Sequence, residues 1–281
     1  MYLSAWACVE CVLVDGRYDD LELVRQIGQG GFSFVFEATH RGSGERLALK
    51  VPRPQVGLGA GSFPVELQQK MAKEVTMMMK CDHPSVVRCL GLVSGGPSGV
   101  AVAMELCTTS LENRLLDGTL SRQQRIKFML DAAEAILFLH QRRVVHRDIK
   151  TANLLLDVTG SVRLGDFGMA RVTQHVTSFS NSSQSARGTP AYSSPEQLRA
   201  EEVTTASDVY SFSVVCYEVL CLQKPWDGLD VHQITTQVVS LQQSVPILEG
   251  LRKAGFDNEL AQVLNRCLAH QPERRPHGGS A

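Results

Sequence analysis

The residues best suited to chemistry lie in positions 146–153, which read His-Arg-Asp-Ile-Lys-Thr-Ala-Asn. This run contains Asp148, Lys150 and Asn153, and a second acidic residue, Asp166, opens the Asp-Phe-Gly tripeptide that follows a short apolar stretch. Such a segment can place a base, a cation and two metal-binding oxygens around one phosphate group. The pattern therefore favours phosphoryl transfer.

The same residues, at the same separation, resemble the catalytic loop and the metal-binding loop of protein kinases. The resemblance implies that Asp148 accepts or orients the proton of a substrate hydroxyl group, and that Lys150 neutralises charge on the γ-phosphoryl group of ATP. It also implies that Asn153 and Asp166 hold the Mg²⁺ ions that bridge the phosphates.

A glycine cluster upstream has a position that fits this family. Alternating apolar residues on either side of the cluster predict a strand–turn–strand hairpin over residues 21–38. Gly28, Gly30 and Val35 match the family pattern GxGxxGxV, whereas Ser33 stands at the third glycine. Glycine lets backbone N–H groups approach phosphate oxygens without a Cβ clash, so the turn is expected to cover ATP.

Lys50 lies in the apolar strand Leu-Ala-Leu-Lys-Val. A lysine on an edge strand often serves only solubility. The resemblance instead implies that Lys50 contacts the α- and β-phosphates and pairs with a glutamate from a helix predicted over residues 64–80. Glu66 and Glu74 are both candidates, and the distance to His83-Pro84 favours Glu74.

The strand that ends at Glu105 is expected to lead into the adenine site. By resemblance Met104 is the gatekeeper residue, and backbone groups of Glu105 and Cys107 bond the adenine. Apolar walls suit a flat base, and Val35, Ala48 and Leu155 are expected to supply them. The full set of residues expected around ATP is Ile27, Gly28, Gly30, Ser33, Val35, Ala48, Lys50, Glu74, Met104, Glu105, Cys107 and Leu155.

A long helix is predicted from Ser121, as its N-cap, to about His140. Five residues repeat at helical spacing and are expected to face the core: Ile126, Leu130, Ala133, Leu137 and His140. A second, mostly apolar segment over residues 207–222 predicts a central buried helix. Asp208 near its start is expected to hold the backbone of the catalytic loop and also to cap the helix.

Residues 166–196 are rich in hydroxyl groups. Arg147, which precedes the catalytic aspartate, is expected to pair with a phosphorylated residue of this segment after modification by an upstream kinase. The candidates for phosphorylation are Thr177, Ser178, Ser180, Ser182, Ser183 and Ser185.

Residues 188–196 resemble the substrate-positioning loop of the family. They begin with Gly-Thr-Pro and end with Ser-Pro-Glu. Thr189 is expected to bridge Asp148 and Lys150, which agrees with transfer to serine or threonine. Ser194 replaces the usual alanine of Ala-Pro-Glu, and Glu196 is expected to pair with Arg275 in the interior.

Composition sets the broad class of the chain. Its 281 residues are 43% hydrophobic, and the net charge is −1. A folded enzyme is therefore expected, with no electrostatic case for nucleic-acid binding. No apolar run is long enough to span a membrane. Cys8 and Cys11 form a CxxC motif, but the sequence has no second CxxC or histidine pair to complete four zinc ligands. Free thiols and a cytoplasmic location are therefore expected.

The expected fold is α+β and bilobal, as in protein kinases. Residues 1–20 form an N-terminal extension, about 21–106 form a small β-rich lobe with one key helix, and about 107–281 form a larger helical lobe. The resemblance covers about residues 21–276. The final helix of the family has no counterpart in the sequence, which ends at Ala281.

The sequence therefore predicts an ATP- and Mg²⁺-dependent protein serine/threonine kinase that resembles the tyrosine-kinase-like group. The alternative is a truncated or inactive kinase-like module that acts by binding a nucleotide or a partner. Inactive relatives usually lack one of the four residues Lys50, Asp148, Asn153 and Asp166, and all four are present here.

Overall fold

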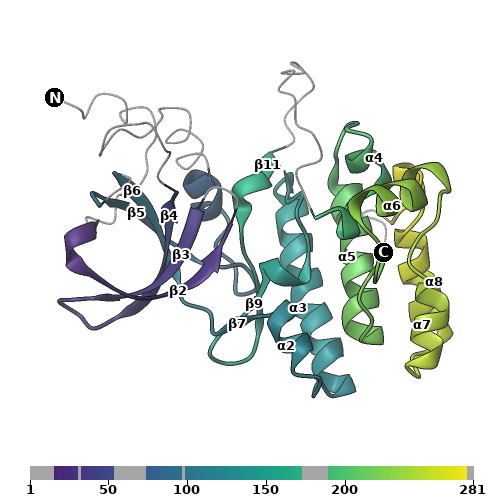
Figure 1. Ribbon diagram of the computed structural model, residues 1–281, viewed down its shortest axis with the longest axis horizontal. Helices are drawn as coiled ribbons and strands as arrows, with labels where there is room; N and C mark the ends of the chain where they lie inside the picture. Colours follow the sequence, from purple (N-terminus) through teal and green to yellow (C-terminus); the bar gives the residue numbers. More distant parts are fainter. Residues whose placement is uncertain (1–15, 31–32, 54–73, 97–98, 173–188, 277–281) are drawn as a thin grey trace. The chain divides into compact units, whose positions relative to one another are not determined.

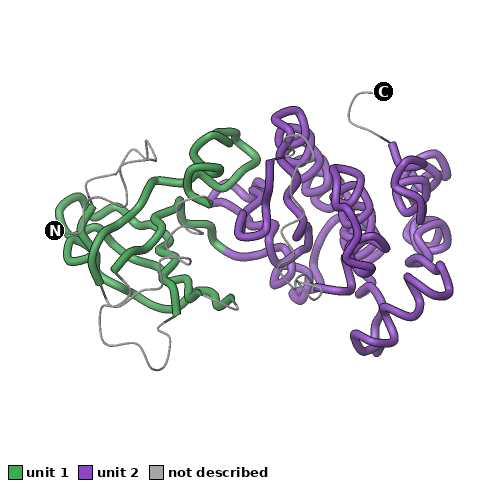
Figure 2. Tube along the Cα trace, turned by 90° about the horizontal axis from the view of Figure 1, so that it is seen from above, with its two compact units in different colours: residues 1–108 green, residues 109–281 purple. Residues whose placement is uncertain are grey.

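The computed structural model describes residues 16–30, 33–53, 74–96, 99–172 and 189–276 (Figure 1). The chain divides into two compact units, residues 1–108 and 109–281 (Figure 2). Unit 1 is built on a β-sheet, and unit 2 is mainly helical. The predicted α+β, kinase-like class is confirmed. No helix in the described part of the chain is both long and apolar enough to cross a membrane.

The sheet of unit 1 has six strands in the order β1-β5-β6-β4-β3-β2. Their bounds are Gly16–Arg17 (β1), Leu21–Gln29 (β2), Ser33–His40 (β3), Arg46–Pro52 (β4), Cys89–Ser94 (β5) and Val100–Glu105 (β6). All neighbours pair antiparallel except β1 and β5, which pair parallel. The hairpin predicted around the glycine cluster is confirmed as β2 and β3.

Alternation along the strands gives this sheet two apolar faces. Leu49 and Ala38 belong to a buried cluster on one face, whereas Val102 belongs to a second cluster with Val75. Residues 74–79 are helical, and Val75 and Met78 are almost fully buried. The apolar side of this helical segment therefore packs on the sheet, which fixes the position of Glu74 at its first described residue.

Unit 2 contains two small sheets and seven α-helices in its described part. The first sheet has the order β10-β9-β7, and the second pairs β11 with β8. The strands are Thr109–Ser110 (β7), Val144–Val145 (β8), Leu154–Leu156 (β9), Val162–Leu164 (β10) and Arg171–Val172 (β11). The helices are Leu111–Leu116 (α2), Arg122–Gln141 (α3), Pro195–Leu198 (α4), Thr205–Cys221 (α5), Val231–Thr235 (α6), Ile247–Lys253 (α7) and Asn258–Cys267 (α8).

Helix α3 begins after Ser121, as predicted, and Ser121 and Gln124 form a capping box. The prediction for its buried face was wrong. Leu130 is 60% exposed, and Ile126 and Leu137 are also exposed. The buried residues are Phe128, Met129, Ala132, Ala135, Ile136, Phe138 and Leu139. Apolar residues occupy both sides of this helix, so spacing alone does not tell which side meets the core.

Helix α5 is the buried helix predicted for the middle of unit 2, and α3, α7 and α8 pack against it. Its N-cap is Thr204, whose side chain accepts a hydrogen bond from Ala206 N. The predicted capping role of Asp208 is therefore wrong. Helix α7 comes close to α5 at Gly250, where an added Cβ would lie 2.8 Å from Cys221 Sγ.

Candidate active site

Three polar side chains of the catalytic loop meet in unit 2 together with Thr189. Lys150 Nζ lies 2.8 Å from Asp148 Oδ2 and donates to Thr189 Oγ1 at 3.1 Å. Asn153 Nδ2 donates to the backbone oxygen of Asp148 at 2.8 Å and to its Oδ2 at 3.0 Å. The ammonium group of Lys150 therefore links Asp148 to Thr189, whereas the sequence predicted that the threonine hydroxyl would be the link.

Asp208 anchors the backbone of this loop from helix α5. Its Oδ2 accepts from His146 N and its Oδ1 from Arg147 N, both at 2.8 Å. Oδ2 also lies 2.9 Å from His140 Nε2, at the end of α3. Asp208 is 1% exposed, so these bonds compensate for removing its carboxylate from water. The predicted contact between Asp208 and the loop backbone is confirmed.

His146 joins the catalytic loop to the Asp-Phe-Gly segment, a role that the sequence reasoning missed. Its Nε2 donates to the carbonyl oxygen of Gly165 at 3.0 Å, and its ring packs edge-on against Phe167. Asp148 N donates to Nδ1 of the same ring at 3.4 Å. The ring is fully buried. The available signal for this buried role was a histidine directly after the apolar pair Val144-Val145.

Two residues of this region have backbone angles that side chains disfavour. Asp166 has φ +59°, and Arg147 has φ +72°. Asp166 Oδ1 accepts from Gly168 N at 3.4 Å, which begins a short 3₁₀ turn over Phe167–Met169. Left-handed backbone at non-glycine residues is uncommon and gathers at functional sites. The loop is held in this geometry by the contacts of Asp208 and His146.

The loop that ends at Glu196 is fixed by a buried ion pair. Arg275 Nη1 and Nη2 donate to Glu196 Oε1 and Oε2 at 2.7 and 2.9 Å, and Ser207 Oγ donates to Oε1 at 2.6 Å. Burial alone would raise the pKa of Glu196, but the bonds from Arg275 and Ser207 outweigh it and lower that pKa. The predicted pair is confirmed.

A second buried network beside this loop was not predicted. Tyr192 OH donates to Glu218 Oε2 at 2.7 Å and lies 3.2 Å from Thr151 Oγ1. Burial raises the pKa of both Tyr192 and Glu218. Gln197 Nε2 donates to the backbone oxygen of Arg147, which ties helix α4 to the catalytic loop. These contacts rigidify the segment around Thr189.

In unit 1, Lys50 and Glu74 form the predicted ion pair, with 2.6 Å between Nζ and Oε1. The two side chains are 15% and 8% exposed. Lys50 lies on β4, and its strand neighbour Ala48 is buried. The pairing supports the choice of Glu74, and the alternative, Glu66, lies outside the described residues.

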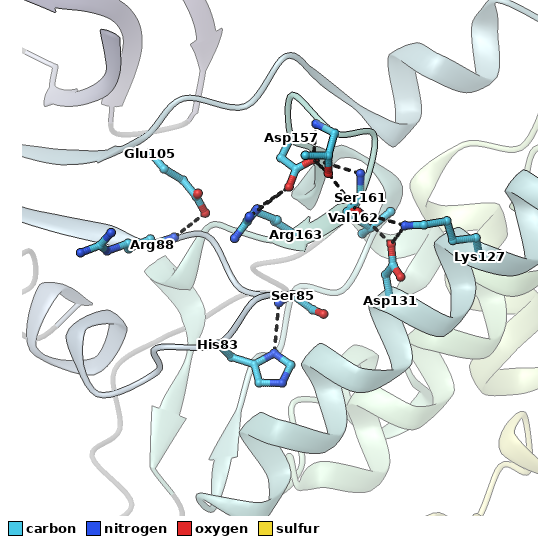
Figure 3. Close-up of polar contacts among 11 residues, drawn as sticks. His83, Ser85, Arg88, Glu105, Lys127, Asp131, Asp157, Ser161, Val162 and Arg163 are labelled. Carbon is cyan, nitrogen blue, oxygen red and sulfur yellow. Dashed lines mark hydrogen bonds and ion pairs between the residues drawn. The ribbon is translucent and has the colours of Figure 1, made fainter. Parts of the chain in front are cut away.

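The segment expected to bind adenine keeps an ordered backbone in unit 1. Glu105 N donates to Arg88 O at 3.0 Å, and Arg88 N donates to Glu105 Oε1 at 2.7 Å (Figure 3). Met104, Glu105 and Cys107 are partly buried. Leu155 lies on β9 of unit 2 and is also partly buried. Their contacts with adenine remain predictions.

The remaining predicted residues fall on the hairpin or outside the described chain. Ile27 is 37% exposed, and Gly28 lies opposite Val35 in the ladder of β2 and β3. Gly30 N donates to Ser33 O at 2.8 Å, which closes the turn. The six candidates for phosphorylation lie outside the described residues.

The donor set fits a hard cation that also binds phosphate. Within the described residues, no group of three or more His, Cys, Asp or Glu side chains could hold a metal on its own. The side-chain nitrogen of Asn153 donates to Asp148. The side-chain oxygen of Asn153 therefore points away from Asp148 and can act as a ligand. One amide and one carboxylate oxygen suit Mg²⁺, which takes few protein ligands and completes its shell with phosphate and water.

The two units and the residues gathered in the catalytic loop agree with the two-lobed fold expected from the sequence. The family model described as the protein kinase domain matches residues 21–279. The chain therefore belongs to the protein kinase family, and the prediction made from residues 146–168 is confirmed. The family implies ATP and a divalent metal cation.

Several curated kinases are similar to the chain. Serine/threonine-protein kinase CTR1 of Arabidopsis thaliana is 32% identical over 94% of this chain and 31% of its own length. Serine/threonine-protein kinase PknB of Mycobacterium leprae is 31% identical over 92% of this chain and 41% of its own length. Dual specificity protein kinase shkE of Dictyostelium discoideum is 30% identical over 89% of this chain and 34% of its own length. The chain thus spans about a third of the length of these relatives.

Proposed function

We propose that this chain transfers the γ-phosphoryl group of ATP to serine and threonine hydroxyl groups of proteins. The observation that carries the proposal is the contact of Lys150 with both Asp148 and Thr189. Asp148 accepts or orients the proton of the attacking hydroxyl, and Lys150 offsets the charge that gathers on the transferred group. Thr189 places the substrate loop against Lys150, which in turn contacts Asp148.

Mg²⁺ is the cation that the donor set favours. Asn153 and Asp166 would hold it, and the bound cation would screen the phosphate oxygens during transfer. Asn153 also donates to Asp148, so the same amide orients the base and presents an oxygen to the cation. In unit 1, Lys50, oriented by Glu74, would bind the α- and β-phosphates.

The test compares three forms of the chain with ATP, Mg²⁺ and peptide arrays of serine, threonine and tyrosine acceptors. Asp148→Asn keeps the shape of the side chain and removes the base, so transfer should fall by about 10²–10⁴-fold. Asp227→Asn, at an exposed position, is the matched control and should behave like the unmodified chain. Equal activity of all three forms would exclude the proposed role of Asp148.

The acceptor preference is read from the same arrays. Serine and threonine peptides should dominate, and arginine upstream of the acceptor should give no strong gain because Ala152 offers no carboxylate. The relative shkE is named a dual specificity protein kinase, and tyrosine acceptors are therefore included in the arrays. A dominant tyrosine signal would overturn the assignment to serine and threonine.

An upstream kinase would activate the chain by supplying an anion to Arg147. Burial, together with the nearby charge of Arg171, lowers the pKa of Arg147. Its buried Nε atom has no hydrogen-bond partner among the described residues. A phosphate group near two arginines would satisfy both charges. If alanine at the six candidate positions of residues 177–185 left activity unchanged after treatment with kinase, this activation would be refuted.

We also place the chain in the cytoplasm. The six cysteines in the described part of the chain are free thiols, as a reducing compartment favours. A fluorescent fusion in cells tests the placement, and secretion of the fusion would contradict it.

A further inference from the structure

The two residues proposed to hold the cation are joined by one short hairpin. Asn153 directly precedes β9, and Asp166 follows β10. The strands pair antiparallel, with Leu154 opposite Leu164, and Gly165 N donates to Asn153 O at 2.9 Å. A change in this register would shift Asp166 relative to Asn153, because every partner along the ladder changes at once.

The carboxylate of Asp157 organises the turn of this hairpin. Its Oδ1 accepts from Thr159 N at 2.8 Å, Thr159 Oγ1 at 2.6 Å and Ser161 N at 3.0 Å (Figure 3). Its Oδ2 accepts from Arg163 Nε at 3.0 Å. Burial alone would raise the pKa of Asp157, but these hydrogen bonds outweigh it and lower the pKa to about 2. The turn is therefore closed around a charged carboxylate at neutral pH.

Helix α3 holds the same hairpin from outside. Asp131 Oδ2 accepts from Val162 N at 2.9 Å and from Lys127 Nζ at 2.6 Å. Lys127 Nζ also donates to Ser161 Oγ at 3.1 Å (Figure 3). The hairpin is thus tied to the helix whose far end carries His140, the partner of Asp208.

We propose that Asp157 is a positioning residue that fixes the register of β9 and β10, and so the separation of Asn153 from Asp166. The inference rests on the proposed function, because that function assigns the cation to these two residues. Asp157 is not one of the two residues proposed to hold the cation. Its carboxylate accepts from the turn residues Thr159 and Ser161 and from Arg163, whose Nη2 also lies 3.0 Å from Oδ2. Its effect on catalysis passes through the geometry of the two ends of the hairpin.

The experiment measures phosphoryl transfer at saturating ATP while Mg²⁺ is varied, in the full chain. Asp157→Ala removes the carboxylate that Thr159, Ser161 and Arg163 contact, and the Mg²⁺ concentration for half-maximal activity should rise about tenfold. Asp157→Asn keeps an oxygen for Thr159 and Ser161 but loses the charge for Arg163, so the rise should be about threefold. Binding of a fluorescent, non-hydrolysable ATP analogue at each Mg²⁺ concentration gives a second readout that needs no turnover.

A merely structural role of Asp157 would reduce the folded fraction without moving the Mg²⁺ dependence of the folded molecules. Gly250→Ala is the matched control, because it overpacks the contact of α7 with α5, far along the chain from the hairpin. An unchanged Mg²⁺ dependence in Asp157→Ala, or an equal shift in Gly250→Ala, would overturn the inference. If Asp157→Ala does not fold, the test is the threefold rise in the Mg²⁺ concentration for half-maximal activity of Asp157→Asn. Absence of that rise overturns the inference.

Failure of the proposed function gives a different result. The unmodified chain would then show no transfer. If it also lacks Mg²⁺-dependent binding of the analogue, the inference is overturned as well; if it binds the analogue, the binding readout decides the role of Asp157. A normal unmodified chain with an unaffected Asp157→Asn refutes the role of Asp157 alone.

Discussion

Removing the carboxylate of Glu196 should leave a buried guanidinium group without its counterion. The side chains of Arg275 and Glu196 are 0% and 3% exposed. Glu196 accepts two hydrogen bonds from Arg275 and one from Ser207. Breaking a buried pair by removing one partner typically costs about 3–5 kcal/mol of folding free energy. We expect Glu196→Ala to lie near the lower end of this range, about 3 kcal/mol.

The lower end is expected because Arg275 keeps other acceptors. Its guanidinium also donates to the carbonyl oxygens of Ala269, Ala206 and His270. Glu196→Gln keeps the shape and one acceptor oxygen, so it should cost about 2 kcal/mol, the scale of a hydrogen bond to a charged group. The double variant Glu196→Ala, Arg275→Met removes both charges and should lose less stability than the sum of the two single variants.

Urea unfolding followed by tryptophan fluorescence measures these free energies. The chain has two tryptophans, and Trp226 lies in unit 2. Trp6→Phe leaves Trp226 as the single reporter, and all variants are made in that background. If Glu196→Ala loses less than about 1 kcal/mol of unfolding free energy, the pair stabilises the fold no more than an exposed ion pair does, and the expected contribution of its burial is refuted. Strict additivity in the double variant would refute the coupling.

Three further predictions concern pH, packing and the phosphate lysine. The pKa of Asp157 is about 2 against 3.8 in the unfolded chain, so its contribution of about 2 kcal/mol should be complete above about pH 5 and fade as pH falls toward 2. Urea midpoints of the unmodified chain should therefore fall more over this range than those of Asp157→Asn. Gly250→Ala should cost about 1–3 kcal/mol by overpacking, and Cys221→Ala in the same chain should restore part of the lost melting temperature. Lys50→Met should lower phosphoryl transfer by about 10²-fold or more, and activity equal to that of Asp227→Asn would contradict the role of Lys50.

Partners of charged residues that are distant in sequence could be predicted where both residues belong to motifs. Lys50 with Glu74, and Glu196 with Arg275, were expected from the resemblance to protein kinases and are present as ion pairs. A buried charge needs a partner, so each motif residue restricts the identity of the other. The hairpin of β2 and β3 and the cap at Ser121 also follow from local patterns of alternation and capping.

The sequence by itself thus determined the family, the two-part α+β fold and the residue types available for phosphoryl transfer. Tertiary structure decided which face of α3 is buried, because that helix is apolar on both sides and only neighbouring elements can choose between them. It also decided the roles of His146 and Tyr192, whose partners Gly165 and Glu218 lie far away in the sequence. Hydrogen bonds depend on position and direction in space, and residue spacing along the chain specifies neither.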